Sequence, residues 1–345
     1  MNDFKLTTTP TMPLNMLIAS LSNAYCSVIQ RKLPIRILPP VMLWGPSGIG
    51  KTQVIRQLAD EIQGQTGKRC VITDVRSLLV KLVKSDNLPM DNGEETVNIL
   101  VLDKSSYTTQ SMQTAEHSII MDRMIGEQEL PENCFIIATG NRENGQSSAT
   151  ELPKALANSM LHIDVECSFE SWKQWAIGAG IHAKVIGFLS FHMDFLMQSE
   201  ASHEDLAFPT PRSWELVSNL LNAVDDDLDR MYPMIAGLIG SGIAIQFRSW
   251  SKIFAQLPSL QDIFEGKSPK LPTYSDAMCA LTSAMTTYAR AHKYDMEKIA
   301  NSIHYAVQMP PDHMSVLMKN YICIEKDYLE KLMQIAEFAQ WYSAQ

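Results

Sequence analysis

The sequence predicts an α/β core built on a parallel sheet, followed by an all-helical region. Two observations predict the core: several short apolar runs show little alternation between faces, and segments with helical periodicity separate them. Strands of this kind are buried on both faces, as in a parallel sheet that helices cover. The third observation is that no convincing strand run follows residue 167, where apolar residues recur at helical spacing.

The expected core begins with an amphipathic helix over residues 14–31, and Pro39 and Pro40 end the approach to the next element. Four apolar runs and a weaker fifth are then predicted to be strands: residues 41–44, 70–73, 99–102, 135–138 and 162–165. Helices are predicted between the first two strands, over residues 53–62, and between the third and fourth, over residues 110–124.

Helical periodicity dominates the rest of the chain. The segments that show it are residues 172–179, 183–197, 214–223, 234–254, 275–291, 298–307 and 325–341. Residues 258–272 are rich in proline and are expected to be a linker. The predicted domains are therefore an α/β core at residues 1–166, a helical domain at residues 167–265, and a C-terminal helical extension at residues 266–345.

The composition excludes several classes of protein. The chain has 345 residues, 46% hydrophobic and 19% charged, which favours a folded protein with more than one core. Its net charge of −9 (29 basic and 38 acidic side chains) disfavours general nucleic-acid binding. The longest apolar stretch, residues 234–245, is too short to cross a hydrocarbon layer of about 30 Å, so no membrane span is expected.

The first residues and the cysteines indicate a cytoplasmic protein. The chain starts Met1-Asn2-Asp3, without the basic-then-apolar order of a secretory signal. The six cysteines lie at least 33 positions apart, which predicts neither a zinc knuckle nor a dense disulfide framework. The eight histidines include no His-Glu-x-x-His pair, so no zinc site is expected.

One motif carries clear chemistry. Residues 45–52, Gly45-Pro46-Ser47-Gly48-Ile49-Gly50-Lys51-Thr52, match the pattern G-x-x-x-x-G-K-[ST] between a predicted strand and a predicted helix. In such a loop the backbone N–H groups surround a β-phosphate and the helix N-terminus adds a positive dipole. Lys51 is expected to reach the β- and γ-phosphates and Thr52 to ligate Mg²⁺. The motif predicts nucleotide binding.

Two further strands end in polar residues. Residues 98–103 form an apolar run that ends in Asp103, the form of a Walker B segment whose carboxylate holds Mg²⁺. Residues 135–141 end in Asn141, an amide able to orient a water molecule near a γ-phosphate. The alternative in each case is a buried strand that closes on an ordinary turn residue.

Together these segments resemble the MoxR-like branch of the AAA+ ATPases. The resemblance runs from about residue 9 to residue 291, and its most specific element is Pro209-Thr210-Pro211-Arg212-Ser213-Trp214. The matching segments are residues 45–52, 102–103, 126–127, 138–143, 156–158, 162–166, 207–214 and 236–240.

The resemblance implies a five-stranded AAA+ P-loop core and a helical lid at residues 167–265. It implies ATP and Mg²⁺ as ligands, with Asn141 as sensor 1 and Arg212 as the sensor 2 arginine of the lid. It also implies a homo-oligomeric ring, with a hexamer as the candidate size, and a partner protein of the von Willebrand A type.

Three features depart from the family pattern. The residue after the Walker B Asp is ordinarily Glu but here is Lys104, whose ammonium cannot accept a proton from water. Ser159 stands where the family carries an arginine that reaches the neighbouring subunit's nucleotide. The connection from Asp74 to Asp103 is shorter than usual, which disfavours a substrate-threading pore loop. The alternative is that a nearby charged residue takes over a missing role, and the candidates are Glu116, Arg123, Arg142, Glu143 and Lys154.

The sequence therefore predicts an ATP-binding AAA+ protein that resembles MoxR-type chaperone ATPases. Hydrolysis is expected to be slow or absent, and the protein to act as an ATP-stabilised assembly or regulatory subunit. One alternative is an active MoxR-like ATPase that remodels a partner protein. Another is a small-molecule kinase that shares only the phosphate-binding loop, although the lid motif around Arg212 argues against it.

Overall fold

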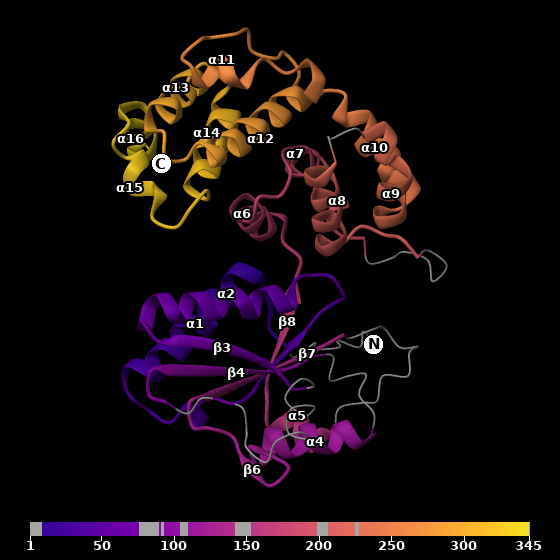
Figure 1. Ribbon diagram of the computed structural model, residues 1–345, viewed down its shortest axis with the longest axis vertical. Helices are drawn as coiled ribbons and strands as arrows, with labels where there is room; N and C mark the ends of the chain where they lie inside the picture. Colours follow the sequence, from indigo (N-terminus) through magenta and orange to yellow (C-terminus); the bar gives the residue numbers. More distant parts are fainter. Residues whose placement is uncertain are drawn as a thin grey trace, which may run out of the picture. The chain divides into compact units, whose positions relative to one another are not determined.

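The chain forms two compact units, Met1–Ser168 and Phe169–Gln345. The computed structural model describes residues 9–75, 90, 93–103, 110–141, 153–198, 206–224 and 228–344. Figure 1 shows strands and helices in the first unit and helices in the second. None of the described helices is both long and apolar enough to pass through a membrane.

The first unit is built on a six-stranded parallel sheet in the order β1-β8-β2-β7-β4-β3. In that order the strands are Thr11–Pro13, Leu161–Glu166, Val41–Trp44, Cys134–Gly140, Thr96–Leu102 and Arg69–Asp74. Every residue of β4 and β7 is buried, as continuous apolar runs in a parallel sheet require. The predicted parallel α/β core is therefore confirmed.

The sheet has one strand more than the predicted five. The additional strand, β1, lies at the sheet edge, where Thr11 pairs with Asp164 and Pro13 with Glu166 of β8. A three-residue strand next to Pro10 carries no periodic pattern, and an edge position tolerates Pro13. A short hairpin of β5 (Met124–Ile125) and β6 (Gln128–Glu129) also escaped prediction, since two-residue strands leave no recognisable run.

Helices cover both faces of this sheet (Figure 1). Helices α1 (Leu14–Gln30) and α2 (Lys51–Thr66) lie on one face, where Tyr25 of α1 stacks on Phe135 of β7 with ring centroids 3.8 Å apart. Helices α4 (Gln110–Met121) and α5 (Lys154–Asn158) lie on the other face. The buried cluster on that side comprises Met42, Val75, Leu100, Leu102, Ile119, Ile120, Ile125, Leu130, Cys134, Ile136, Ala138, Leu156 and Met160.

The described part of the second unit contains helices and no strand, which confirms the predicted helical region. Its α-helices are α6 (Phe169–Ala179), α7 (Ala183–Phe191), α8 (Pro211–Ala223), α9 (Leu228–Ile239), α10 (Ser241–Ser251), α11 (Leu260–Phe264), α12 (Ser275–Ala291), α13 (Met296–Ala306), α14 (Pro311–Ile322), α15 (Tyr328–Leu332) and α16 (Ala336–Ser343). Among the described residues, the 3₁₀ helices are η1 (Ile35–Ile37) in the first unit, and η3 (Met193–Phe195) and η4 (Phe254–Gln256) in the second.

Several helix boundaries differ from the prediction. The segment expected as one helix over residues 234–254 is broken at Gly240, which has φ +83°, a conformation that favours glycine. The segment expected at residues 325–341 is likewise split into α15 and α16. Helix α14 was not predicted at all; it begins at Pro311, which is acceptable in a first helical turn.

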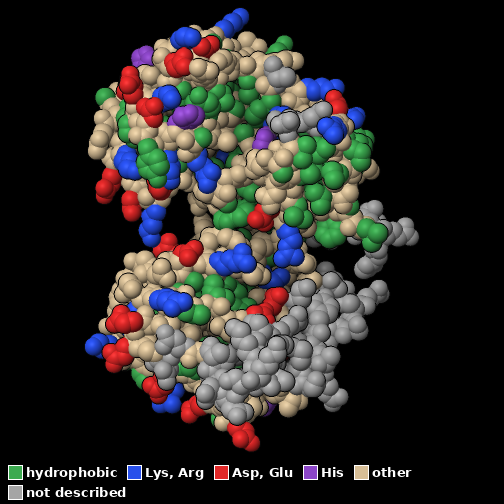
Figure 2. Space-filling model, viewed as in Figure 1, with side chains coloured by type: hydrophobic (Ala, Val, Ile, Leu, Met, Phe, Trp, Pro, Cys, Tyr) green, Lys and Arg blue, Asp and Glu red, His purple; other side chains and the backbone are tan. Residues whose placement is uncertain are grey.

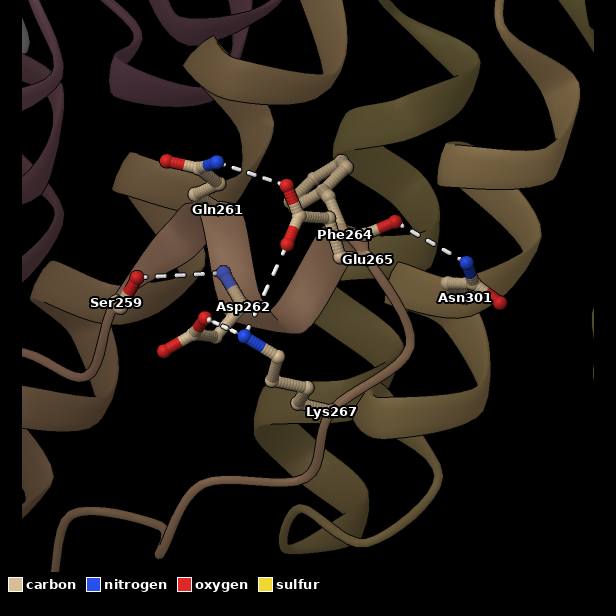
Figure 3. Close-up of polar contacts among 7 residues, drawn as sticks. All are labelled: Ser259, Gln261, Asp262, Phe264, Glu265, Lys267 and Asn301. Atoms are coloured by element: carbon tan, nitrogen blue, oxygen red, sulfur yellow. Dashed lines mark hydrogen bonds and ion pairs between the residues drawn. The ribbon is translucent and has the colours of Figure 1, made fainter.

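The expected linker at residues 258–272 contains helix α11 and is tied to the rest of the unit (Figure 3). The Ser259 hydroxyl accepts a hydrogen bond from the backbone N–H of Asp262 at 3.2 Å and so caps the helix. The Lys267 ammonium lies 2.6 Å from the Asp262 carboxylate, and the Asn301 amide of α13 donates to the Phe264 carbonyl at 3.1 Å. The first two contacts order the segment itself, and the bond from Asn301 ties it to α13.

Candidate functional site

The candidate site is the loop at residues 45–50, between β2 and α2. The backbone N–H of Gly45 donates to the Gly140 carbonyl at 3.2 Å, so the loop leaves the sheet beside the end of β7. Gly50 has φ +110° and precedes the first residue of α2. Ile49 is 2% exposed and anchors the loop in the core, whereas Ser47 is exposed. The sequence thus forms the strand, loop and helix that its motif predicts.

Lys51 lies back over the loop that precedes it. Its ammonium donates to the carbonyl oxygens of Gly45 at 2.6 Å and Pro46 at 2.9 Å. The side chain is half-buried, while the next residue, Thr52, is exposed at the start of α2. The cation is therefore held beside the backbone that would surround a phosphate.

Asp103 and Asn141 follow the ends of the next two strands across the sheet. Strand β7 lies between β2 and β4, and Thr139 of β7 donates a hydrogen bond from its hydroxyl to the Asp103 carboxylate at 2.7 Å. Thr139 is 1% exposed, while Asp103 and Asn141 are half-buried. Since all three strands are parallel, Lys51, Asp103 and Asn141 lie at the same edge of the sheet.

The role of Thr139 was not predicted, although the residue belongs to a motif that was noted. Its hydroxyl donates a hydrogen bond to one oxygen of the Asp103 carboxylate. Mg²⁺ in nucleotide sites commonly takes one or two protein oxygens, with phosphate oxygens and water completing its shell. A carboxylate and the Thr52 hydroxyl are suitable donors for such an ion. The described residues contain no cluster of three or more His, Cys, Asp or Glu that would hold a metal by itself.

The residues expected to replace missing catalytic groups have mixed placements. Two of these candidates, Arg142 and Glu143, lie outside the described residues, as does Lys104, the residue that departs from the family pattern. The Arg123 guanidinium donates to the carbonyls of Pro131 and Cys134, at 3.2 and 2.7 Å, so it supports the chain around the β5–β6 hairpin.

Ser159 ends helix α5, where its backbone N–H donates to the Leu156 carbonyl at 3.1 Å. Its side chain is half-buried. Lys154, at the start of the same helix, is exposed, and Glu116 on α4 is buried.

The motif at residues 209–214 starts helix α8 in the second unit. The Thr210 hydroxyl accepts from the Ser213 backbone N–H at 3.0 Å, and the Ser213 hydroxyl accepts from the Thr210 backbone N–H at 2.7 Å. This reciprocal pair is a capping box, with Pro211 at the first helical position. Trp214 is fully buried and donates from its indole to the Phe195 carbonyl at 2.7 Å.

Arg212 differs from its neighbours in this motif because its side chain is exposed. Pro211, Ser213 and Trp214 are buried and serve the start of the helix. The local structure therefore presents an arginine at the surface of the second unit. Its assignment as sensor 2 stays a prediction, as does the assignment of Asn141 as sensor 1.

Charged side chains are mixed on the face drawn in Figure 2. Among the residues that the figure describes there, basic and acidic groups alternate over both units without forming a continuous basic area. This part of the surface does not provide the dense positive charge that binds a phosphate backbone.

No family model and no curated protein matches this chain. Among solved structures it is similar to the ORC2 protein of Aeropyrum pernix in ADPNP and ADP complexes, with a TM-score of 0.36, 11% identity, and coverage of 100% of this chain and 98% of that chain. It is also similar to PCH-2 of C. elegans, with a TM-score of 0.34, 15% identity, and coverage of 81% and 69%.

A third similar structure is the AMPPCP-bound DnaA of Aquifex aeolicus, with a TM-score of 0.30, 12% identity, and coverage of 93% of this chain and 92% of that chain. Similarities this weak carry no argument about what this chain does. The fold class rests on the parallel sheet, the loop at residues 45–50 and the helices of the second unit.

We predict that Thr210 and Arg212 respond differently to truncation. Thr210→Ala removes the capping hydroxyl and should lower the free energy of unfolding by about 1 kcal/mol. Arg212→Ala removes an exposed side chain and should change it by less than about 0.5 kcal/mol. Urea denaturation of the two variants and the wild type measures both effects. An equal loss of stability in Arg212→Ala would mean that this arginine serves the fold.

Proposed function

We propose that this chain is an AAA+ protein that binds ATP and Mg²⁺ through residues 45–52 and hydrolyses ATP slowly or not at all. The observation that supports it best is the combination of two features at one edge of the sheet. The loop holds the Lys51 ammonium beside its own backbone, and the Asp103 carboxylate is fixed by the Thr139 hydroxyl. A cation and an anchored carboxylate at the carboxyl ends of parallel strands suit a magnesium–phosphate ligand.

Each residue of the loop has a distinct part in this proposal. The backbone N–H groups of residues 47–50 and the N-terminus of α2 face the phosphates, since Pro46 has no N–H and that of Gly45 donates to the Gly140 carbonyl. Lys51 leaves its two carbonyl partners for the β- and γ-phosphate oxygens. Thr52 and Asp103 hold Mg²⁺, which neutralises phosphate charge when it is bound. Asn141 and Arg212 are proposed as the sensor residues.

We predict that Lys51→Ala weakens ATP binding by about 10- to 100-fold, because a charge-assisted contact with the phosphates is lost while the backbone of the loop remains. Isothermal titration calorimetry with ATP and Mg²⁺ measures this change. Lys68→Ala is the control, since Lys68 precedes β3 and its ammonium contacts the Glu94 carbonyl near the opposite ends of the strands. Equal ATP affinity in the wild type and Lys51→Ala would contradict the site.

Two substitutions relative to the family pattern support slow hydrolysis. Lys104 provides no carboxylate to polarise the attacking water, and the Ser159 hydroxyl lacks the charge of the arginine that the family carries there. A general base contributes about 10²- to 10⁴-fold and an arginine finger about 10³- to 10⁵-fold to such reactions. Arg123, one candidate replacement, already donates to two backbone carbonyls.

We predict that Lys104→Glu and Ser159→Arg together raise ATP hydrolysis by more than the product of their separate effects. Both groups act on one transition state, so restoring one alone should achieve little. Phosphate release, measured for the wild type, both single variants and the double variant, tests this coupling. Lys51→Ala in the double variant is the control for a contaminating ATPase.

One result would favour the alternative of an active ATPase. Wild-type hydrolysis of about one ATP per second or faster, abolished by Lys51→Ala, would contradict the proposal of a degenerate site. Activity of that kind would fit a MoxR-like enzyme that remodels a partner protein.

The more specific parts of the proposal come from the sequence resemblance. They are the MoxR-like type, a homo-oligomeric ring of hexamer size, and a partner protein of the von Willebrand A type. A cytoplasmic location is also proposed, from the wide spacing of the six cysteines. In this proposal bound ATP stabilises the assembly, because a ligand that binds only the assembled state shifts the equilibrium towards it.

A further inference from the structure

Trp44 is the last residue of β2 and directly precedes the loop at residues 45–50. Its indole N–H donates to Nδ1 of His162 at 2.9 Å, and the two rings are nearly parallel, with an interplanar angle of 13°. His162 belongs to β8, the neighbouring strand, where it pairs in register with Met42. The two residues are 118 positions apart in the sequence.

His162 makes a second hydrogen bond on its other ring nitrogen. Nε2 lies 2.7 Å from the carbonyl oxygen of Ala157 in helix α5. A carbonyl only accepts, so Nε2 carries the proton, and Nδ1 is then free to accept from the indole of Trp44. The bond to Trp44 and the bond to Ala157 therefore require the same tautomer of the imidazole, with the proton on Nε2. The imidazole can make both bonds at once and so connects these two residues.

The Trp44 ring also lies against the end of β7. A Cβ atom at Gly140 would stand 2.7 Å from Cζ3 and 2.9 Å from Cε3 of the indole, closer than a side chain tolerates. The Gly140 carbonyl, in turn, accepts from the N–H of Gly45, the first residue of the loop. Trp44 therefore contacts both strands that flank β2: His162 near the start of β8 and Gly140 at the end of β7.

The same hydrogen bonds reach the turn that carries Ser159. Ala157 is in the last turn of α5, and Ser159 ends that helix two residues later. The path from the loop to this turn consists of Trp44, His162 and the Ala157 carbonyl, joined by bonds of 2.9 and 2.7 Å. One imidazole thus fixes the residue before the loop relative to the end of α5.

We propose that His162 is a positioning residue for the nucleotide loop and acts through the indole of Trp44. This inference rests on the proposed binding of ATP at residues 45–52. A glycine-rich loop binds phosphate well only where its backbone N–H groups are already oriented. His162 restricts the direction in which the chain leaves β2 and couples it to the turn at Ser159.

The test compares ATP affinities, measured by calorimetry with Mg²⁺, in folded variants. His162→Phe keeps a ring but removes the acceptor, and Trp44→Phe removes the donor. Each should weaken ATP binding about 3- to 10-fold, the range expected for one neutral hydrogen bond. The double variant should resemble Trp44→Phe alone, because His162 acts through that side chain. His162→Gln, which retains an acceptor and a donor, should recover at least half of the binding free energy that His162→Phe loses.

Trp172→Phe is the matched control. The indole nitrogen of Trp172 is buried in the second unit without a hydrogen-bond partner among the described residues, so ATP affinity should stay within about twofold of the wild type. Fluorine NMR of protein labelled with 5-fluorotryptophan adds a second readout. The resonance that is absent from the spectrum of Trp44→Phe belongs to Trp44. Its chemical shift should change when ATP is added to the wild type, and should differ from the wild type in His162→Phe without ATP.

The outcomes separate this inference from the proposed function. If the wild type does not bind ATP, the proposed function is wrong. If the wild type binds ATP but Trp44→Phe and His162→Phe match it within twofold, or if their effects simply add, the positioning role is wrong. Should His162→Phe not fold, the comparison of Trp44→Phe, His162→Gln and Trp172→Phe still decides: undiminished affinity in Trp44→Phe overturns the inference.

Discussion

The parallel pairing of β2, β7 and β4 is the constraint on which the candidate site depends. Because these strands run in the same direction, their carboxyl ends bring Lys51, Asn141 and Asp103 to one edge of the sheet. Lys51 and Asn141, which are 90 positions apart in the sequence, are thereby brought to the same part of the fold. Helices on both faces exclude water from the central strands, whose residues are all buried in β4 and β7. Close packing of this kind holds the carboxyl ends of the strands in fixed positions.

Two side-chain hydrogen bonds orient individual groups at the carboxyl ends of these strands. Thr139 orients the carboxylate of Asp103, and His162 holds the indole of Trp44 beside the loop. Thr139 lies on β7, which is adjacent to β4, the strand that Asp103 follows. His162 lies on β8, which is adjacent to β2, the strand that ends at Trp44. Groups held in this way lose less conformational entropy when a ligand binds, which is how a fold preorganises a binding site.

The main strands were predicted well from the sequence because strands that are buried on both faces consist of continuous runs of apolar residues. The sequence also predicted the loop, whose glycines and Lys51 have a fixed spacing. Strand β1 escaped because it is three residues long, and the break at Gly240 because periodicity continues across it. The contacts of Thr139 and His162 depend on the register between distant strands, such as Met42 with His162, and single-sequence patterns do not contain register.

Backbone hydrogen–deuterium exchange with and without ATP and Mg²⁺ tests the central claim most directly, because it reports the very N–H groups that are assigned to the phosphates. The account predicts that saturating ATP slows exchange most strongly in peptides covering residues 45–54, with weaker protection at residues 99–103. Unchanged exchange at residues 45–54 under saturating ATP, or protection confined to residues 169–344, would contradict it.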